Sequence, residues 1–378
     1  MALARARPDL RRVVTRVVIA PDSFKGTATA ADAAAALAAG WRSVRAGDDL
    51  VERPMADGGE GTLDAFASSV PGAQRMPITV RGPVTDPVES SWVLLPDGTG
   101  VVELAATSGI TLLDPLEPLD AHSAGFGEAI AAALEGGAER LLLGLGGSAS
   151  SDGGTAALTV LGAWFLDASG APVPLGNRGL AMLDRVDLTG LRPLPPGGAV
   201  ILGDVTNPLL GPLGAAAIFG PQKGADAATV DVLEANLARL ADLMPEQLQP
   251  YAAAPGAGAA GGTGFGLLAW GASMGGGAAL VAQAVGLREA IDGADLVITG
   301  EGRFDGQSEA GKAPTVVAAL ARDAGAPTAL VAGAITAEPR GFAASVALAD
   351  LAGGGVAAMA EPLRWLEAAG AELARTRG

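Results

Sequence analysis

Short runs of β-branched residues alternate along the chain with Ala-rich stretches of helical periodicity. Arg16–Ala20 and Asp49–Arg53 are typical of buried strands, and each is followed by a polar loop and then by a helical pattern. This order is the signature of a parallel sheet covered by helices. We expect parallel strands at residues 16–20, 49–53, 141–145, 295–299, 327–332 and 345–349.

The middle of the chain has a different pattern. Two alternating runs, Ser90–Leu95 and Gly100–Ala105, flank Asp97-Gly98, which is a strong signal for an antiparallel hairpin. We therefore expect an α/β fold with a doubly wound, mostly parallel sheet domain of the Rossmann or flavodoxin-like kind and a second, inserted mixed α/β domain. The first domain should comprise residues 1–74, 119–160 and 288–378, and the second residues 75–118 and 161–287. The active site is expected in the cleft between them.

Composition excludes several kinds of site. The chain has no cysteine, so disulfides, zinc–thiolate sites and thiol nucleophiles are excluded, and a cytoplasmic location is favoured. No apolar run approaches the ~20 residues that span a bilayer. The Arg-rich first dozen residues lack the apolar segment of a secretory signal and are expected to form a loose tail. The single histidine, His122, is expected at the start of a helix rather than as a catalytic base.

Charge makes the lysines informative. The net charge of −16 predicts no general affinity for nucleic acid or membranes, so an anionic substrate would need locally placed cations. Only three of the 25 basic residues are lysines, and each lies beside a glycine: Lys25, Lys223 and Lys312. A compact charge beside exposed backbone suits a phosphate group.

Four loops that follow expected parallel strands combine glycine with charged side chains. They are Pro21–Gly26, Asp57–Glu60, Gly146–Gly154 and Gly300–Gly306. Ligands of open α/β sheets bind beyond the carboxyl ends of the strands, so these loops predict one shared site. In the second domain, the Gly-rich stretch 255–266 predicts either close approach of a ligand to the backbone or a mobile lid.

Two further motifs allow other interpretations. Gly144–Ala149 fits G-x-G-x-x-A, with Asp167 at the distance of a ribose-binding acid, which leaves open an NAD-dependent oxidoreductase of a small hydroxy acid. Residues 306–312 match G-x-x-x-x-G-K, but Ala313 stands where a P-loop needs Ser or Thr for magnesium. A non-catalytic sugar-acid sensor is also conceivable, although the acidic residues retained in the loops argue against it.

Seven motifs in order resemble the type I glycerate kinase family, whose members act as glycerate 2-kinases. They span nearly the whole chain: Ile19–Gly26, Ala56–Thr62, Gly144–Gly154, Gly203–Pro208, Phe219–Gly224, Gly256–Gly262, and Ile298–Gln307 with Gly311–Pro314. The resemblance is weaker at Asp120–Gly127 and after Gly333. It implies transfer of the γ-phosphate of ATP to (R)-glycerate with Mg²⁺, giving 2-phosphoglycerate. The expected partner is this small molecule alone, with no nucleic acid and no membrane, in a monomer or homodimer.

The site hypothesis assigns roles by loop position. Lys25, Asp204 and Asp57 are predicted to be catalytic, with Asp204 activating the hydroxyl. Substrate binding is predicted for Ser23, Gly58, Gly59, Glu60, Asn207 and Arg303. Nucleotide or phosphate binding is predicted for Gly146, Gly147, Ser148, Asp152, Lys223, Gly261, Gly262 and Lys312. Glu301 and Asp305 are the predicted magnesium ligands, because this ion takes few carboxylates together with water and phosphate oxygens.

Overall fold

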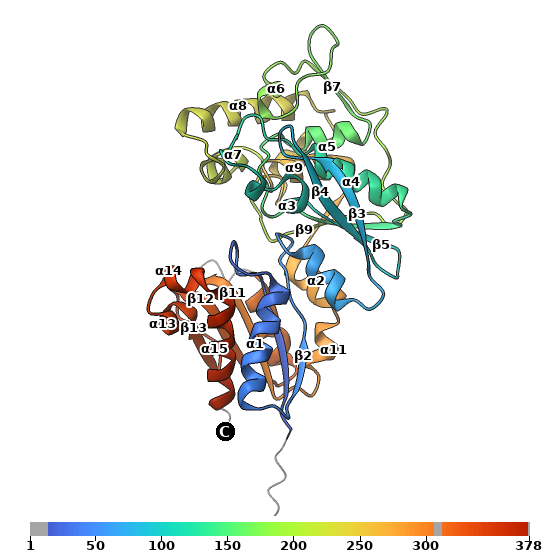
Figure 1. The fold of residues 1–378 in the computed structure, drawn as a ribbon. Coiled ribbons are helices and arrows are strands. Elements are labelled where there is room, and N and C mark those ends of the chain that lie inside the picture. Colours follow the sequence, from blue (N-terminus) through green and yellow to red (C-terminus); the bar gives the residue numbers. More distant parts are fainter. Residues whose placement is uncertain (1–13, 306–311, 377–378) are drawn as a thin grey trace, which may run out of the picture.

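The computed structural model describes residues 14–305 and 312–376. The Arg-rich tail and the glycines of the 306–312 motif lie outside the described residues. Two lobes stand end to end in Figure 1, and each is built around its own sheet. No helix within the described ranges is both long and apolar enough to cross a membrane.

The first sheet has five strands in the order β13-β12-β11-β1-β2, all parallel to their neighbours. They are β1 (Arg16–Pro21), β2 (Asp49–Glu52), β11 (Leu296–Phe304), β12 (Thr328–Ile335) and β13 (Ala344–Ala347). Counted along the chain this is the order 2-1-3-4-5 of flavodoxin-like folds, which confirms the expected class. The order reverses between β1 and β11, where such sheets bind ligands.

Helices cover both faces of this sheet. Alternate residues of β1 face opposite ways: Val17 and Ile19 meet α1 (Ala30–Val44) and α15 (Pro362–Arg375), whereas Val18 and Ala20 meet the other side. That second face is covered by α11 (Leu287–Ile291) and α12 (Ala313–Asp323), as well as by two helices shared with the other domain. Helices α1 and α15 lie side by side in Figure 1, because Gly40 and Gly370 leave room for backbone contact.

The second sheet has six strands in the order β10-β9-β6-β5-β4-β3. They are β3 (Gln74–Arg81), β4 (Pro87–Leu94), β5 (Thr99–Glu103), β6 (Arg140–Gly144), β9 (Ala199–Leu202) and β10 (Ser273–Gly275). The four strands β10, β9, β6 and β5 are parallel to their neighbours. The predicted hairpin at Asp97-Gly98 joins β4 to β5 in antiparallel fashion, and β3 pairs with β4, also antiparallel.

The predicted membership of strand 141–145 is therefore wrong. This strand, β6, pairs with β5 and β9 in the second sheet, so the first sheet has five strands rather than six. With it, α4 (Ala124–Glu135) and α5 (Thr155–Val160) join the second core, against the assignment of residues 119–160 to the first domain. Its apolar run showed burial on both faces, but such a run does not tell which sheet contains the strand.

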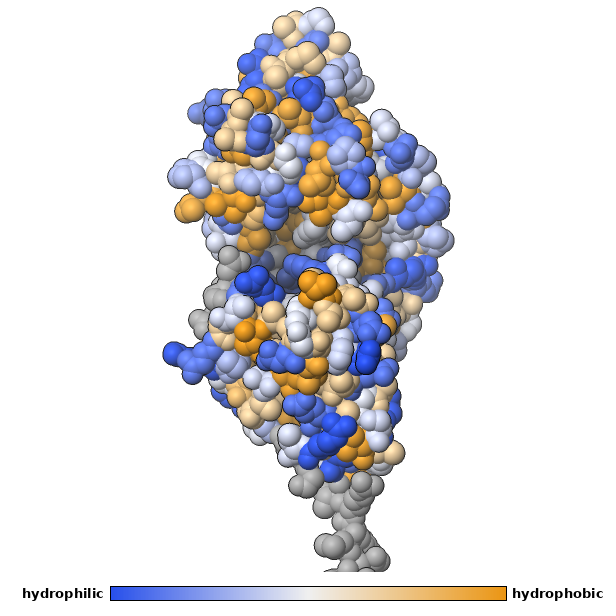
Figure 2. All heavy atoms as spheres, turned by 60° about the vertical axis from the view of Figure 1, so that its left-hand side comes forward, coloured by the Kyte–Doolittle hydropathy of each residue, from blue (hydrophilic) through white to orange (hydrophobic). Residues whose placement is uncertain are grey.

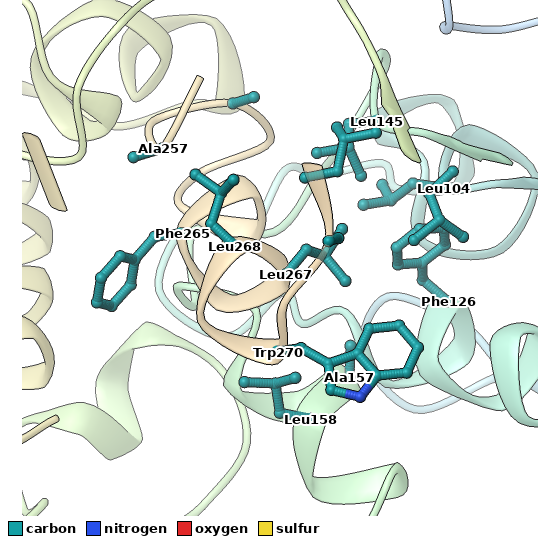
Figure 3. Close-up of a cluster of buried hydrophobic side chains, with 14 of the residues drawn as sticks. Leu104, Phe126, Leu145, Ala157, Leu158, Ala257, Phe265, Leu267, Leu268 and Trp270 are labelled. Atoms are coloured by element: carbon teal, nitrogen blue, oxygen red, sulfur yellow. The ribbon is translucent and has the colours of Figure 1, made fainter. Parts of the chain in front are cut away.

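A wholly apolar helix fills the second core. In α9 (Thr263–Trp270), Phe265 points to one side, whereas Leu267 and Trp270 point toward Leu104 and Phe126 (Figure 3). A helix that is hydrophobic all round is stable only when it is buried. The remaining elements are α3 (Ala105–Ser108), β7 (Trp164–Leu166), α6 (Asn177–Leu180), β8 (Arg185–Asp187), α7 (Ala215–Phe219), α8 (Ala227–Leu243), α13 (Leu348–Ala352) and α14 (Gly355–Ala360), with 3₁₀ turns at 110–112, 221–223 and 249–253.

The two domains share one hydrophobic cluster. Helices α2 (Thr62–Ser69) and α10 (Gly277–Ala284) lie between the sheets, and Phe66 and Val281 pack in the same cluster as Val18 and Leu202. The loop before α2 touches the ends of β6 and β9: Gly146 N–H donates to Gly58 O over 3.0 Å. The carboxyl ends of both sets of parallel strands therefore meet at this loop.

Gly58 tests this junction. It has φ +94°, and a Cβ there would lie 2.3 Å from Leu202 O, whereas Gly61 has φ +91° with nothing within 4 Å. Gly61→Ala should cost about 1 kcal/mol of unfolding free energy from the left-handed backbone alone. Gly58→Ala should cost about 2 kcal/mol more, because the backbone of β9 must move. Urea denaturation of both variants measures the difference; equal costs would contradict a tight junction.

Candidate active site

Two cavities open where the sheets meet. The lysine cavity, of about 340 Å³, is lined by all three lysines together with Asp57, Asp204 and the loop Gly146–Ser148. The switch-point cavity, of about 470 Å³, lies beyond β1 and β11 and is lined by Asp22, Ser23, Glu301, Arg303 and Asp305, among others. Lys25, Asp57 and Lys312 line both cavities. Figure 2 shows the surface hollowed between the lobes.

The loop after β1 places an acid, a hydroxyl and a cation in succession. Asp22 N–H donates to Gly300 O over 2.8 Å, and Ser23 N–H donates to Asp22 Oδ1 over 2.6 Å, so the loop is fixed to the end of β11. Asp22 is buried, and its burial raises its carboxyl pKa well above the usual value; nearby Asp57 raises it further, whereas Lys25 opposes the shift. Lys25 itself is exposed to the cleft.

The end of β11 supplies the predicted metal ligands and their cationic neighbours. Glu301 is buried, and its Oε2 lies 3.8 Å from Lys312 Nζ, while Arg303 Nε lies 3.7 Å from Asp305 Oδ2. Glu301 and Asp305 both line the switch-point cavity. Among the residues that the structure describes, no group of three or more acids or histidines has the arrangement of a metal site.

Asp204 and Asp57 approach each other from different domains. Asp57 Oδ1 accepts a 3.1 Å hydrogen bond from Gly59 N–H, which folds the loop back on itself. The amides of Gly277 and Ala278, at the start of α10, lie close enough to the Asp204 carboxylate to lower its pKa. Partial burial raises the pKa of Asp204, and the charge of Asp57 raises it further, while these two amides oppose the rise.

Lys223 is a buried residue that lines the lysine cavity. It is 3% exposed and donates a short hydrogen bond to Ser150 O. Burial lowers the pKa of this ammonium to about 7, although Asp152 partly opposes the shift. The adjacent loop is ordered by Ser148 Oγ, which accepts a 3.1 Å bond from Ser150 N–H. A buried lysine without a close carboxylate bond can gain charge stabilisation from an anion that enters the cavity.

Other predicted site residues have internal roles. Asp152 is fully buried, and its carboxylate accepts bonds from Ser123 N–H and Oγ at 3.0 and 2.8 Å, so it joins α4 to α5. Asn207 Nδ2 donates to Leu213 O over 2.8 Å within its own turn. Gly261 and Gly262 allow close backbone packing against Ser150, Ser151 and Gly153. None of these four is among the residues that line either cavity.

Asp167 and His122 are not among the residues that line either cavity. Asp167 Oδ1 accepts bonds from Ser169 and Ala171 N–H in an exposed turn after β7, so it does not approach Gly144–Ala149 as a ribose ligand. His122 is buried just before α4, and its Nε2 lies 2.8 Å from Val84 O. As expected from the sequence, it contributes to the start of a helix.

Glu103 is a buried acid that was not among the site residues predicted from the sequence. It ends β5 and accepts hydrogen bonds from Gly61 and Leu63 N–H at 3.3 and 2.9 Å, which fixes the start of α2 and the loop carrying Asp57. It lines a third, more open cavity together with Glu60. In the sequence, Glu103 is distinguished only as a single charged residue at the end of an otherwise apolar strand.

Two α/β domains bring glycine-rich loops and three lysines to one cleft, an arrangement typical of proteins that bind small anions. Comparison with known proteins narrows the class. The model of the glycerate kinase family matches residues 17–377. Glycerate kinase of Bacillus subtilis strain 168 is 42% identical over 327 residues, with 85% of each chain covered. Glycerate 2-kinase of Escherichia coli K12 is 42% identical over 327 residues, covering 85% of this chain and 86% of the relative.

A solved structure agrees with these relatives. A protein from Salmonella typhimurium LT2, assigned as glycerate kinase 2, superimposes with a TM-score of 0.81 at 36% identity, over 96% of this chain and 98% of that chain. The chain therefore belongs to the glycerate kinase family, and it is a kinase. The resemblance that the seven motifs suggested is confirmed.

Glu103 predicts a specific dependence of stability on pH. Burial raises its pKa from 4.5 to about 7, with smaller contributions from Asp64 and Glu60. Because the folded-state pKa is raised, the stabilisation is fully present below pH 4.5 and is lost as pH rises through about 7. The stability of the wild type relative to Glu103→Gln should fall by about 3 kcal/mol between pH 4.5 and 8. Urea denaturation of both proteins at several pH values measures it.

Glu89→Gln is the control for this experiment, because it removes an exposed carboxylate from the same third cavity. It should follow the wild-type profile. A constant difference between wild type and Glu103→Gln across the pH range would show that Glu103 does not take up a proton on folding.

Proposed function

We propose that this kinase transfers the γ-phosphate of ATP to (R)-glycerate and releases ADP and 2-phospho-(R)-glycerate. The convergence of three lysines from distant loops on one cavity carries the proposal. In a chain of net charge −16, this placement concentrates positive charge where anionic substrates must meet. The names of the relatives supply glycerate as the acceptor.

The transfer takes place where the two cavities join. Lys25 and Lys312 line both cavities and can neutralise the γ-phosphate as it moves from one side to the other. Phosphoryl transfer needs mainly alignment and charge neutralisation, and both follow from cations fixed on separate loops. Gly146, Gly147, Ser148 and Lys223 serve as further anion-binding groups, and Ser23, Gly58, Gly59 and Arg303 as groups that bind substrate around the junction. Glu60 would contribute from the third cavity, which shares Ser23 and Lys25.

Asp204 activates the acceptor hydroxyl. As the hydroxyl oxygen forms its bond to the γ-phosphorus, the bond from this phosphorus to the β,γ-bridging oxygen breaks, ADP leaves, and the hydroxyl proton passes to Asp204 Oδ. The amides of Gly277 and Ala278 stabilise the charged carboxylate, and Asp57 lines the same cavity. General base catalysis of this kind contributes typically 10²- to 10⁴-fold.

Magnesium fits the switch-point cavity. Asp22 is buried, and its pKa is raised partly by Asp57 and Glu301, so carboxylates gather there at an electrostatic cost that a divalent cation would relieve. Glu301 and Asp305 would hold the ion together with phosphate oxygens, in keeping with the few carboxylates that Mg²⁺ takes. When bound, it would supply charge neutralisation on the phosphates. The cytoplasmic location and the monomeric or homodimeric state remain predictions.

The activity and its regiochemistry can be tested together. Purified protein is incubated with Mg·ATP and (R)-glycerate, ADP release is followed, and the product is identified by ³¹P NMR. We expect glycerate-dependent ADP and a phosphate on the 2-hydroxyl. Phosphate on the 3-hydroxyl would contradict the proposed product, and no glycerate-dependent ADP would contradict the proposed acceptor or donor.

Replacing Asp204 by Asn tests the base. Asn keeps an oxygen that can accept from the Gly277 and Ala278 amides but cannot take the proton. We expect kcat to fall at least about 100-fold, with KM for glycerate changed less than threefold. Steady-state kinetics measures both. Turnover within threefold of wild type would exclude Asp204 as the base.

A further inference from the structure

The two cavities that share Lys25, Asp57 and Lys312 can each hold one of the two substrates. They join only through Lys25, Asp57 and Lys312 among the described lining residues, so the reacting groups meet there and the remaining parts of each substrate extend in opposite directions. ATP carries a large, flat, uncharged base, whereas glycerate carries one small carboxylate. The lining of one cavity should therefore suit a flat, uncharged base, and the lining of the other should suit a small carboxylate.

The outer wall of the switch-point cavity is apolar. It is formed by Ala334, Leu348, Ala358, Met359 and Pro362, from the end of β12 and from α13–α15. Met359 is 60% exposed and neighbouring Val356 is 81% exposed, which is unusual for large apolar side chains. A purine would cover such a surface, and a methionine thioether packs favourably against an aromatic ring.

The inner end of the same cavity is polar. Ser23 is buried, and its Oγ has no hydrogen-bond partner among the described residues. Buried hydroxyls are normally bonded, so an acceptor from a ligand would satisfy this one. Lys312 and Arg303 lie along the same wall. The cavity thus changes from apolar near Met359 to charged toward the junction, where three cations lie among four carboxylates. Cations there can bind phosphate oxygens directly, and the carboxylates can do so through a divalent cation.

The lysine cavity is also lined by apolar side chains, among them Phe219 and Met274, but it differs from the switch-point cavity in having a buried cation. There the buried Lys223 ammonium lies beside the loop Gly146–Ser148. The cavity volume of about 340 Å³, against about 470 Å³ for the switch-point cavity, also suits the smaller substrate. A carboxylate near Lys223 would restore the charged state that burial disfavours.

We propose that the purine base and ribose lie in the switch-point cavity against Leu348 and Met359, and that the carboxylate of the hydroxy acid lies in the lysine cavity toward Lys223. The assignment rests on the proposed kinase function and specifies it. It gives Lys223 and Gly146–Ser148 to the carboxylate, in contrast to the nucleotide role that the sequence predicted. It also agrees with the fold, because the switch-point cavity lies where flavodoxin-like sheets bind nucleotides.

Three glycines allow a matched test. A Cβ on Gly355, Gly203 or Gly47 would meet nothing within 4 Å, and none of the three needs a left-handed backbone. Gly355 lines the switch-point cavity, Gly203 lines the lysine cavity, and Gly47 lies in an exposed turn after α1. Leucine is placed at each position, because an aromatic side chain could stack on a purine instead of displacing it.

ADP binding is measured by calorimetry without glycerate, and KM for each substrate is measured in steady state. Gly355→Leu should weaken ADP binding at least fivefold and raise KM for ATP, with KM for glycerate within twofold of wild type. Gly203→Leu should raise KM for glycerate at least fivefold and leave ADP binding unchanged. Gly47→Leu should match wild type in all three. Unchanged ADP binding in Gly355→Leu, or weakened ADP binding in Gly203→Leu, would overturn the assignment.

If the proposed kinase function is wrong, the same measurements will give a different result from the one that overturns the cavity assignment. Wild-type protein that binds no ADP and shows no glycerate-dependent turnover would contradict the proposed function before any variant is compared. A wild type that binds ADP, with the two variants showing each other's expected effects, would instead keep the kinase and reverse the cavities.

Discussion

The close contact between the loop after β2 and the ends of β6 and β9 is the constraint on which the site depends. Gly58 accepts a hydrogen bond from Gly146 N–H, and Gly277 lies against the backbone of Asp57 from the start of α10. Only glycine lets three backbone segments approach so closely. Because Lys25 belongs to one domain and Lys223 to the other, the distance between their charges is set by this contact.

The charges at the junction are arranged for ligands rather than for stability. Lys223 is buried with its pKa lowered to about 7, and Asp22 is buried with its pKa raised well above the usual value. Each arrangement costs free energy in the empty protein and is relieved when a group of opposite charge binds. Perturbed titratable groups of this kind cluster at functional sites, and here both lie beside residues that line the cavities.

Much of the fold was accessible from the sequence, because strand periodicity and turn chemistry act locally. The flavodoxin-like sheet and the hairpin at Asp97-Gly98 follow from such signals. The sheet to which β6 belongs could not be predicted in this way, because an apolar run suits the centre of either sheet equally well. Its loop still reaches the predicted site, because both sets of parallel strands end at the same junction.

Some residues of the candidate site could likewise be predicted from the local sequence, whereas the roles of others depend on tertiary contacts. The lysines were recognisable because they are rare and lie beside glycine, and the structure brings all three together. Asp152 and Asn207 looked similar, as polar residues in glycine-rich loops, but Asp152 binds Ser123 from a distant segment and Asn207 binds Leu213 within its own turn. Whether a polar loop residue caps its own fold or faces a ligand depends on such tertiary partners, which the local sequence does not specify.

The scarcity of lysine allows a direct measurement of the central claim that these side chains form one transfer site. Purified protein is treated with an amine-acylating reagent, and modification of each lysine is followed by mass spectrometry with and without saturating MgADP and glycerate. We expect the two bound ligands together to slow acylation of Lys25 and Lys312 at least tenfold. Unchanged acylation of both lysines under saturating ligands would contradict it.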